Sequence, residues 1–163
     1  MSRRRDMQGF TLVEAMIVLV LLALIAGLAM PNLTRMTATH QVEAQAQILH
    51  SLLQFARSEA VVHRTSISLS NSADDWLVTH VEDKRVLRQE TINPEQATIT
   101  STLAAPIVLT YQANGTAESA DFIVCRNDEA EFAYQITVQP NGNTRLLPRG
   151  RDASGLALQD CTP

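Results

Sequence analysis

Residues 9–31 read GFTLVEAMIVLVLLALIAGLAMP and contain the longest apolar run of the chain. Of the 21 residues between positions 10 and 30, 18 are apolar, and the exceptions are Thr11, Glu14 and Gly27. As a helix, this segment is about 31 Å long, close to the thickness of the hydrocarbon core of a bilayer. Three arginines, at positions 3–5, precede it. They favour a cytoplasmic N-terminus, with the rest of the chain outside the cytoplasm.

The overall composition excludes several classes of protein. The chain has 163 residues, of which 45% are hydrophobic and 18% charged, and its formal net charge is -4. This composition excludes a long disordered tail, a collagen-like repeat and a multi-span membrane protein, and the length suits one domain. A mildly acidic chain is also a poor candidate for binding nucleic acid over most of its surface.

Three interpretations of the N-terminus compete. A cleaved secretory signal has a shorter apolar core, of roughly 7–15 residues, and a small-residue cleavage site. Here the run is longer, and Ala29-Met30-Pro31 is a poor cleavage site. A plain signal anchor fits the length but leaves Glu14 unexplained, because a carboxylate in a lipid-facing helix costs about 2.5–3.5 kcal/mol and usually marks a function.

The third interpretation explains the carboxylate. A short basic leader is followed by Gly9, Phe10, a Thr-Leu pair, Glu14 and then the apolar run. This pattern resembles the processing site of type IV prepilins and pseudopilins. The resemblance implies that a prepilin peptidase removes the leader peptide, residues 1–9, by cutting between Gly9 and Phe10. It further implies N-methylation of Phe10 and residence in the inner membrane before assembly.

Glu14 then has a physical role. The new amino terminus at Phe10 is a cation, and Glu14 lies one helical turn further along. We expect Glu14 to form an assembly salt bridge with the terminus of a neighbouring subunit, since such a pair in low dielectric is favoured over either charge alone. Loss of the leader reduces the 13 basic and 17 acidic residues to 10 and 16, so the mature chain has a net charge of -6.

The pattern beyond the leader predicts one long helix followed by strands. Residues 10–30 form its transmembrane or assembly half, and residues 31–63 form an amphipathic half with polar residues, including Arg57, opposite an apolar stripe. The stripe contains Val42, Leu49, Leu53, Ala56 and Ala60. Gly27 and Pro31 lie between the halves and are expected to weaken or kink the helix.

Residues 64–163 predict a β-rich globular head. Short segments bounded by turn signals predict strands over residues 65–70, 76–81, 85–90, 97–102, 106–112, 121–125, 131–139 and 143–147. Asn114-Gly115 and Asn141-Gly142 are hairpin signals. We therefore expect an α+β fold in which the long helix packs on an antiparallel sheet. The resemblance implies the same type IV pilin-like arrangement.

Segments at the end of the helix and in the head indicate one family among the prepilin-like proteins. Residues 52–60 (LLQFARSEA), a glycine hairpin over 111–116, the segment 122–125 and a last hairpin at 141–142 follow one another in the chain. Their order resembles that of the GspH/FimT family. This family contains the FimU and FimT types of type IV pilus minor pilin and the GspH minor pseudopilin of type II secretion.

A cysteine at the extreme C-terminus favours the minor pilin. The resemblance then implies a structural adaptor that initiates type IV pilus assembly and sits in the pilus tip complex, for twitching and adhesion. Its partners are the major pilin and other minor pilins, and its final location is the fibre at the cell surface. The GspH minor pseudopilin is the alternative.

The two cysteines, Cys125 and Cys161, lie 36 positions apart. In a periplasm-facing head they are expected to form a disulfide that holds the tail from Leu147 onward against the strand over 121–125. A loop of this size is worth about 4 kcal/mol. A zinc site or a redox pair is the alternative, but zinc needs further ligands at suitable spacing. The four histidines form no cluster with the sequence spacing of zinc ligands. They are His40, His50, His63 and His80.

No catalytic motif is present in the sequence. It contains no nucleophile elbow, no HExxH zinc motif, no P-loop and no dinucleotide fingerprint. We therefore expect a protein that is not an enzyme and that needs no metal or cofactor.

The tail contains the one candidate binding patch, which consists of Arg145, Arg149 and Arg151. Guanidinium groups bind phosphates through fork geometry. FimT-type minor pilins are associated with DNA uptake through a Gly-Arg-x-Arg motif in this region. Here the corresponding residues are 142–145 (GNTR), so only the second arginine is kept, and the sequence places no aromatic residue nearby to stack bases. DNA binding by this flexible tail is the alternative to a solvated or subunit-contacting tail.

Overall fold

The computed structural model describes residues 11–72 and 75–163, and for residues 28–35 it describes the backbone alone. The chain divides into two compact units, Met1–Thr37 and Ala38–Pro163. Helix α1 spans Leu12–His63 and continues through Gly27 and Pro31 without a break. The expected weakening of the helix at these two residues stays a prediction.

In the second unit, α1 buries the predicted stripe. Val42 is 2% exposed, and Leu49, Leu53, Ala56 and Ala60 are fully buried. The helix ends at His63, the next residue, Arg64, has φ +51°, and the backbone N–H of Thr65 donates to the carbonyl oxygen of Ala60. A left-handed residue with this hydrogen bond is a common helix end.

The first sheet has the strand order β3-β2-β1-β5, and all of its pairings are antiparallel. Its strands are β1 (Ile67–Ser72), β2 (Asp75–His80), β3 (Val86–Thr91) and β5 (Val108–Tyr111). Leu69 of β1 lies opposite Val78 on one side and Leu109 on the other. All three side chains are buried, so this register directs one face of the sheet to the core.

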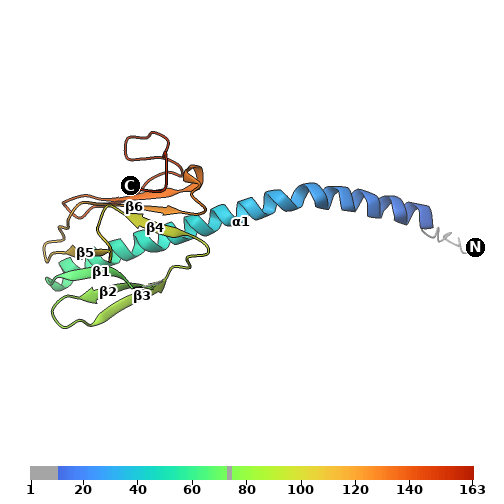
Figure 1. The fold of residues 1–163 in the computed structure, drawn as a ribbon. Coiled ribbons are helices and arrows are strands. Elements are labelled where there is room, and N and C mark those ends of the chain that lie inside the picture. Colours follow the sequence, from blue (N-terminus) through green and yellow to red (C-terminus); the bar gives the residue numbers. More distant parts are fainter. Residues whose placement is uncertain (1–10, 73–74) are drawn as a thin grey trace, which may run out of the picture. The chain divides into compact units, whose positions relative to one another are not determined.

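The second sheet has the order β4-β6-β7-β8 and is also antiparallel. Its strands are β4 (Thr98–Ser101), β6 (Ala120–Cys125), β7 (Tyr134–Val138) and β8 (Thr144–Leu146), and a short 3-10 helix, η1 (Ala130–Phe132), precedes β7. Figure 1 shows the labelled strands of both sheets gathered around the C-terminal part of α1.

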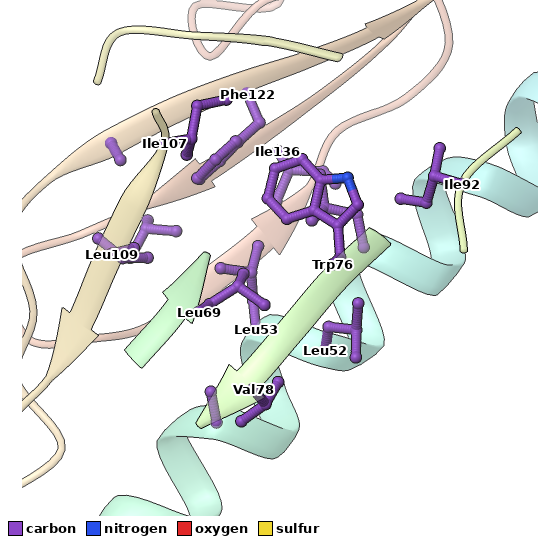
Figure 2. Close-up of a cluster of buried hydrophobic side chains, with 14 of the residues drawn as sticks. Leu52, Leu53, Leu69, Trp76, Val78, Ile92, Ile107, Leu109, Phe122 and Ile136 are labelled. Carbon is purple, nitrogen blue, oxygen red and sulfur yellow. The ribbon is translucent and has the colours of Figure 1, made fainter. Parts of the chain in front are cut away.

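The core lies where the helix and both sheets meet. Leu52 and Leu53 of α1 point toward side chains of the two sheets in Figure 2. The rings of Trp76, from the first sheet, and Phe122, from the second, meet edge to face with their centroids 6.3 Å apart. The aromatic contact joins the two sheets directly, so the head is one packed unit.

The predicted α+β fold is confirmed, and each predicted strand matches one of the eight strands in the structure. The structure differs in having two sheets instead of one. The first part of the segment predicted as a strand over 131–139 is η1 instead. Periodicity identifies strands, but pairing between distant strands depends on tertiary contacts that a single sequence does not carry.

Candidate functional site

The N-terminal part of α1, taken by itself, exposes apolar side chains on all sides. Eleven large apolar residues between Leu12 and Ile25 are exposed, from 43% for Val18 to 76% for Leu12. A helix that is apolar all round needs lipid or other apolar chains around it. This surface therefore has the chemistry of an assembly or membrane segment.

Glu14 is the only charged residue between positions 11 and 27. Its backbone N–H donates to the hydroxyl oxygen of Thr11 at 3.2 Å, so Thr11 caps the helix and Glu14 occupies its first turn. A carboxylate there is favoured by the helix dipole. The expected partner of Glu14, the amino terminus at Phe10, lies outside the described residues, as does the cleavage position after Gly9. The assembly salt bridge therefore stays a prediction.

Within residues 11–72 and 75–163, no helix has the length and apolarity that a membrane span requires. The predicted segment over 10–30 includes Phe10 and the side chains of residues 28–30, which lie outside that description.

The disulfide joins Cys125, at the end of β6, to Cys161 in the tail, with a Cα–Cα distance of 5.9 Å. Both cysteines are buried, and they form a small cluster with Ile123 and Ala133. The hydroxyl of Thr100 donates to the carbonyl oxygen of Cys161 at 2.5 Å, which fixes the tail to β4 as well. The bond is the predicted one, and it places the C-terminal tail against the second sheet.

The tail covers the face of the second sheet that is turned away from the main core. The backbone N–H of Leu147 donates to the carbonyl oxygen of Gln135, and that of Gly150 to Ala133. A Cβ at Gly150 would lie 2.6 Å from the carbonyl oxygen of Glu131, so the tail approaches η1 closely. These contacts correct the expectation of a flexible tail.

The three tail arginines differ in what they contact. Arg145 lies on β8 opposite Thr137, and its exposed side chain forms no hydrogen bond or ion pair within the described residues. The guanidinium of Arg149 lies 5.5 Å from the centroid of the Phe132 ring, a cation–π contact. Arg151 donates to the carbonyl oxygen of Gly155 at 3.1 Å. An aromatic residue therefore does lie beside the arginines, contrary to the sequence prediction, because η1 brings Phe132 to the tail.

Arg57 is a residue whose role the sequence interpretation missed. The sequence pattern predicts that it lies on the polar face of the helix, but its side chain is half-buried and joins the helix to two turns. Its Nε donates to the carbonyl oxygen of Gly115 at 3.2 Å, and an Nη donates to that of Asn141 at 3.0 Å. The two Asn-Gly signals identify the turns, but nothing local shows that one helical arginine bonds both of them.

Tyr111 lies beneath this junction and is fully buried. Its hydroxyl is 3.4 Å from the hydroxyl of Thr144. Burial raises the pKa of Tyr111, and the Thr144 hydrogen bond and the charge of Arg57 oppose that rise. The phenol is therefore held in its neutral form, as its place in the core requires.

The histidines are placed separately. His40 lies beside Glu43, His63 beside Glu59 and His80 beside Asp83. His50 lies 3.5 Å from the carbonyl oxygen of Thr144. Within the described part of the chain, no three His, Cys, Asp or Glu residues gather as a metal site.

Two family profiles match the chain. The first, described as Type II transport protein GspH, matches residues 45–142. The chain belongs to the GspH family. The second, the prokaryotic N-terminal methylation motif, matches residues 4–30 and covers the cleavage position and Glu14. The GspH match contains Arg57, both Asn-Gly turns and Cys125, so the junction at the end of α1 lies within the family region.

Individual relatives agree with this assignment. Type II secretion system protein H of Pseudomonas aeruginosa is 25% identical over 94% of this chain and 91% of its own length. The solved type IV minor pilin FimU of Pseudomonas aeruginosa covers 75% of this chain and 96% of its own, at 24% identity and a TM-score of 0.63. The minor pseudopilin EpsH from the type 2 secretion system of Vibrio cholerae covers 66% of this chain and 96% of its own, at 17% identity and a TM-score of 0.54. The pilin-like fold is therefore confirmed.

Membership of the GspH family establishes the general role of this chain. It is a minor pilin or pseudopilin, and the family and its fold are those of structural subunits. The methylation motif implies processing by a prepilin peptidase and assembly with other pilins. The same motif indicates membrane anchoring and assembly at the surface.

Proposed function

We propose that this GspH-family subunit is a minor pilin of a type IV pilus. It acts as a structural adaptor that initiates pilus assembly and joins the major pilin to other minor pilins in the tip complex. The observation that carries the proposal is the disulfide between Cys125 at the end of β6 and Cys161 in the tail after β8, the feature in which the chain resembles pilins more than pseudopilins.

The assembly route follows from the N-terminal residues. The peptidase removes residues 1–9, Phe10 is methylated, and residues 10–30 cross the inner membrane once, with residues 31–163 in the periplasm. Glu14 then pairs with the terminus of a neighbouring subunit. The exposed apolar side chains between Leu12 and Ile25 support this route, because neighbouring helices bury them in a fibre.

The GspH minor pseudopilin of type II secretion is the second candidate. It is supported by the relative named type II secretion system protein H, which aligns with 94% of this chain. A deletion strain separates the two functions. Loss of surface pili and twitching, with normal release of secreted proteins, supports the minor pilin. The reverse pattern supports the pseudopilin and refutes the first proposal.

DNA binding through Arg145, Arg149 and Arg151 stays a third, separate prediction. The ring of Phe132 beside Arg149 supports it, since an aromatic ring next to cations suits a nucleotide. The Arg149 and Arg151 side chains already contact their own chain, however, so Arg145 is the most available cation. A gel shift with DNA at low salt tests it, using the wild type and the triple alanine variant. An unshifted band for the wild type refutes DNA binding.

A further inference from the structure

A hollow of about 520 Å³ opens beside the last turns of α1 in the head. Its lining comes from the helix on one side and from the start of β8, with the turn before it, on the other. The lining residues include Arg57, Ser58, Val61, Val62, Asn143 and Thr144. The volume lies within the range of protein sites that bind small ligands or side chains.

Arg57 is the only charged residue among those that line the hollow. A guanidinium carries five N–H groups, and here one from Nε and one from an Nη donate to turn carbonyl oxygens. Three N–H groups remain for another acceptor. Within the described residues, no carboxylate forms an ion pair with Arg57. The structure therefore holds a half-buried cation, in an acidic protein, without a negative partner.

The rest of the lining indicates which anion fits. Val61 is 48% exposed and Val62 is 72% exposed, so they offer an apolar wall to an incoming group. The hydroxyls of Ser58 and Thr144 also line the hollow, but Ser58 donates to the carbonyl oxygen of Phe55, and the hydroxyl of Thr144 pairs with that of Tyr111. The free N–H groups of Arg57 are therefore the main donors to an incoming anion. A single carboxylate on an aliphatic stem matches one cation beside an apolar wall. A phosphate carries up to two charges and favours several cations.

We propose that this hollow is a docking site for an aspartate or glutamate side chain of another subunit in the same assembly. Arg57 supplies the charge-assisted hydrogen bonds, and Val61 and Val62 contact the carbon stem of the incoming residue. This proposal rests on the proposed function as a fibre subunit. It assigns a specific contact surface to the end of α1, away from the N-terminal apolar segment.

The direct test changes the wall and leaves Arg57 in place, because Arg57 also holds the two turns. Val62→Glu puts a carboxylate beside the hollow, and Val62→Gln is the matched neutral control. The full chain in detergent micelles is titrated with the capped tripeptide Val-Glu-Ala and with its glutamine counterpart. Backbone amide NMR shifts of the lining residues report binding.

We expect saturable shifts confined to the lining residues with the glutamate peptide, and binding at least about tenfold weaker with the glutamine peptide. Val62→Gln loses the apolar contact of Val62 and should weaken binding of the glutamate peptide slightly, whereas Val62→Glu, which has a similar size but adds a negative charge, should weaken it about tenfold more. Equal shifts with both peptides would overturn the proposal. So would tighter saturation by inorganic phosphate, which would identify a small-anion site.

A second measurement separates this proposal from the proposed function. Immunoblots of sheared fibres measure incorporation of the wild type and of the two Val62 variants. Absence of the wild type from the fibre refutes the pilin function, whatever the peptide titration shows. Wild-type incorporation with equal incorporation of Val62→Glu and Val62→Gln refutes the docking site and leaves the function standing. Loss confined to Val62→Glu supports both.

Discussion

Replacing Gly142 with alanine is expected to destabilise the head at the junction between its two Asn-Gly turns and α1. Gly142 has φ +75°, and a Cβ there would overlap the carbonyl oxygen of Gly115 and lie 3.0 Å from Nε of Arg57. Ordinary contacts of a Cβ lie at 3.4–4 Å. The backbone of one turn must therefore move, and this movement breaks or lengthens the hydrogen bonds that Arg57 donates.

Two costs combine in this variant. A non-glycine residue in the left-handed region costs about 1–2 kcal/mol. Loss of one hydrogen bond from a charged donor costs about 1.5–3 kcal/mol. Alanine also restricts the unfolded chain, which returns about 0.4–1 kcal/mol. The net decrease in the free energy of unfolding should be about 3 kcal/mol.

Gly155→Ala is the matched control. Gly155 has φ +79°, but a Cβ there would meet no atom within 4 Å. This variant has the left-handed cost without the steric clash, so its net destabilisation should be about 1 kcal/mol. The difference between the two variants therefore isolates the close approach of the two turns.

Urea unfolding of the full chain in micelles measures both variants. The fluorescence of Trp76 reports on the head, because it is the only tryptophan and is 4% exposed in the core. We expect Gly142→Ala to unfold at clearly lower urea than Gly155→Ala. A difference below about 0.5 kcal/mol would refute the argument, since that is the usual error of comparing separate sites.

Three further predictions use the same chain. Changing Cys125 and Cys161 together to serine should lower the stability of the head by about 4 kcal/mol in the Trp76 assay, and an unchanged midpoint would contradict the stabilising role of the tail disulfide. Glu14→Gln should leave head unfolding unchanged and reduce incorporation into sheared fibres; normal incorporation would argue against the assembly salt bridge. Because burial raises the pKa of Tyr111, its contribution to stability is complete below about pH 10, where the free phenol titrates, and is lost as the pH rises further. The free energy of unfolding of Tyr111→Phe should therefore fall less steeply above that pH than that of the wild type. Equal slopes of the free energy of unfolding against pH for the variant and the wild type would contradict this.

The long helix and the strands could be predicted because their signals are local. The stripe from Val42 to Ala60 repeats at helical spacing, and its residues are buried in the structure as predicted. The approximate positions of the strands follow from alternation and from the two Asn-Gly turns, although their exact ends do not. The methylation motif is a contiguous pattern, so the prepilin-type N-terminus could be predicted without tertiary information.

Long-range contacts could not be predicted in the same way. The separation into two sheets depends on contacts such as that of Trp76 with Phe122, which lie 46 positions apart in the sequence. The bond between Arg57 and Asn141 spans 84 positions, and the contact of Arg149 with Phe132 depends on the short helix η1. An arginine on the polar face of a helix usually points to solvent. The helical pattern therefore predicts an exposed side chain for Arg57, whereas the structure has it half-buried against two turns.

Strand β6 has both of its faces buried, and the tail covers one of them. A strand in a two-layer domain usually buries alternate side chains, yet Phe122, Ile123, Val124 and Cys125 are all at most 1% exposed. Phe122 and Val124 belong to the main core, whereas Ile123 and Cys125 belong to the small cluster with Cys161. The second face of β6 is therefore buried by the disulfide-bonded tail, and the disulfide keeps that cover in place.

The N-terminal segment has the opposite property, because its own chain buries none of its large apolar residues between Leu12 and Ile25. Within lipid, these side chains gain little from meeting another apolar helix, since lipid tails are equally apolar. Glu14 differs, because an unpaired carboxylate in lipid costs about 2.5–3.5 kcal/mol. That cost corresponds to about a hundredfold preference for any arrangement that gives Glu14 a cationic partner. We therefore propose that Glu14, the one charged side chain between positions 11 and 27, favours the assembled state over a membrane-inserted monomer.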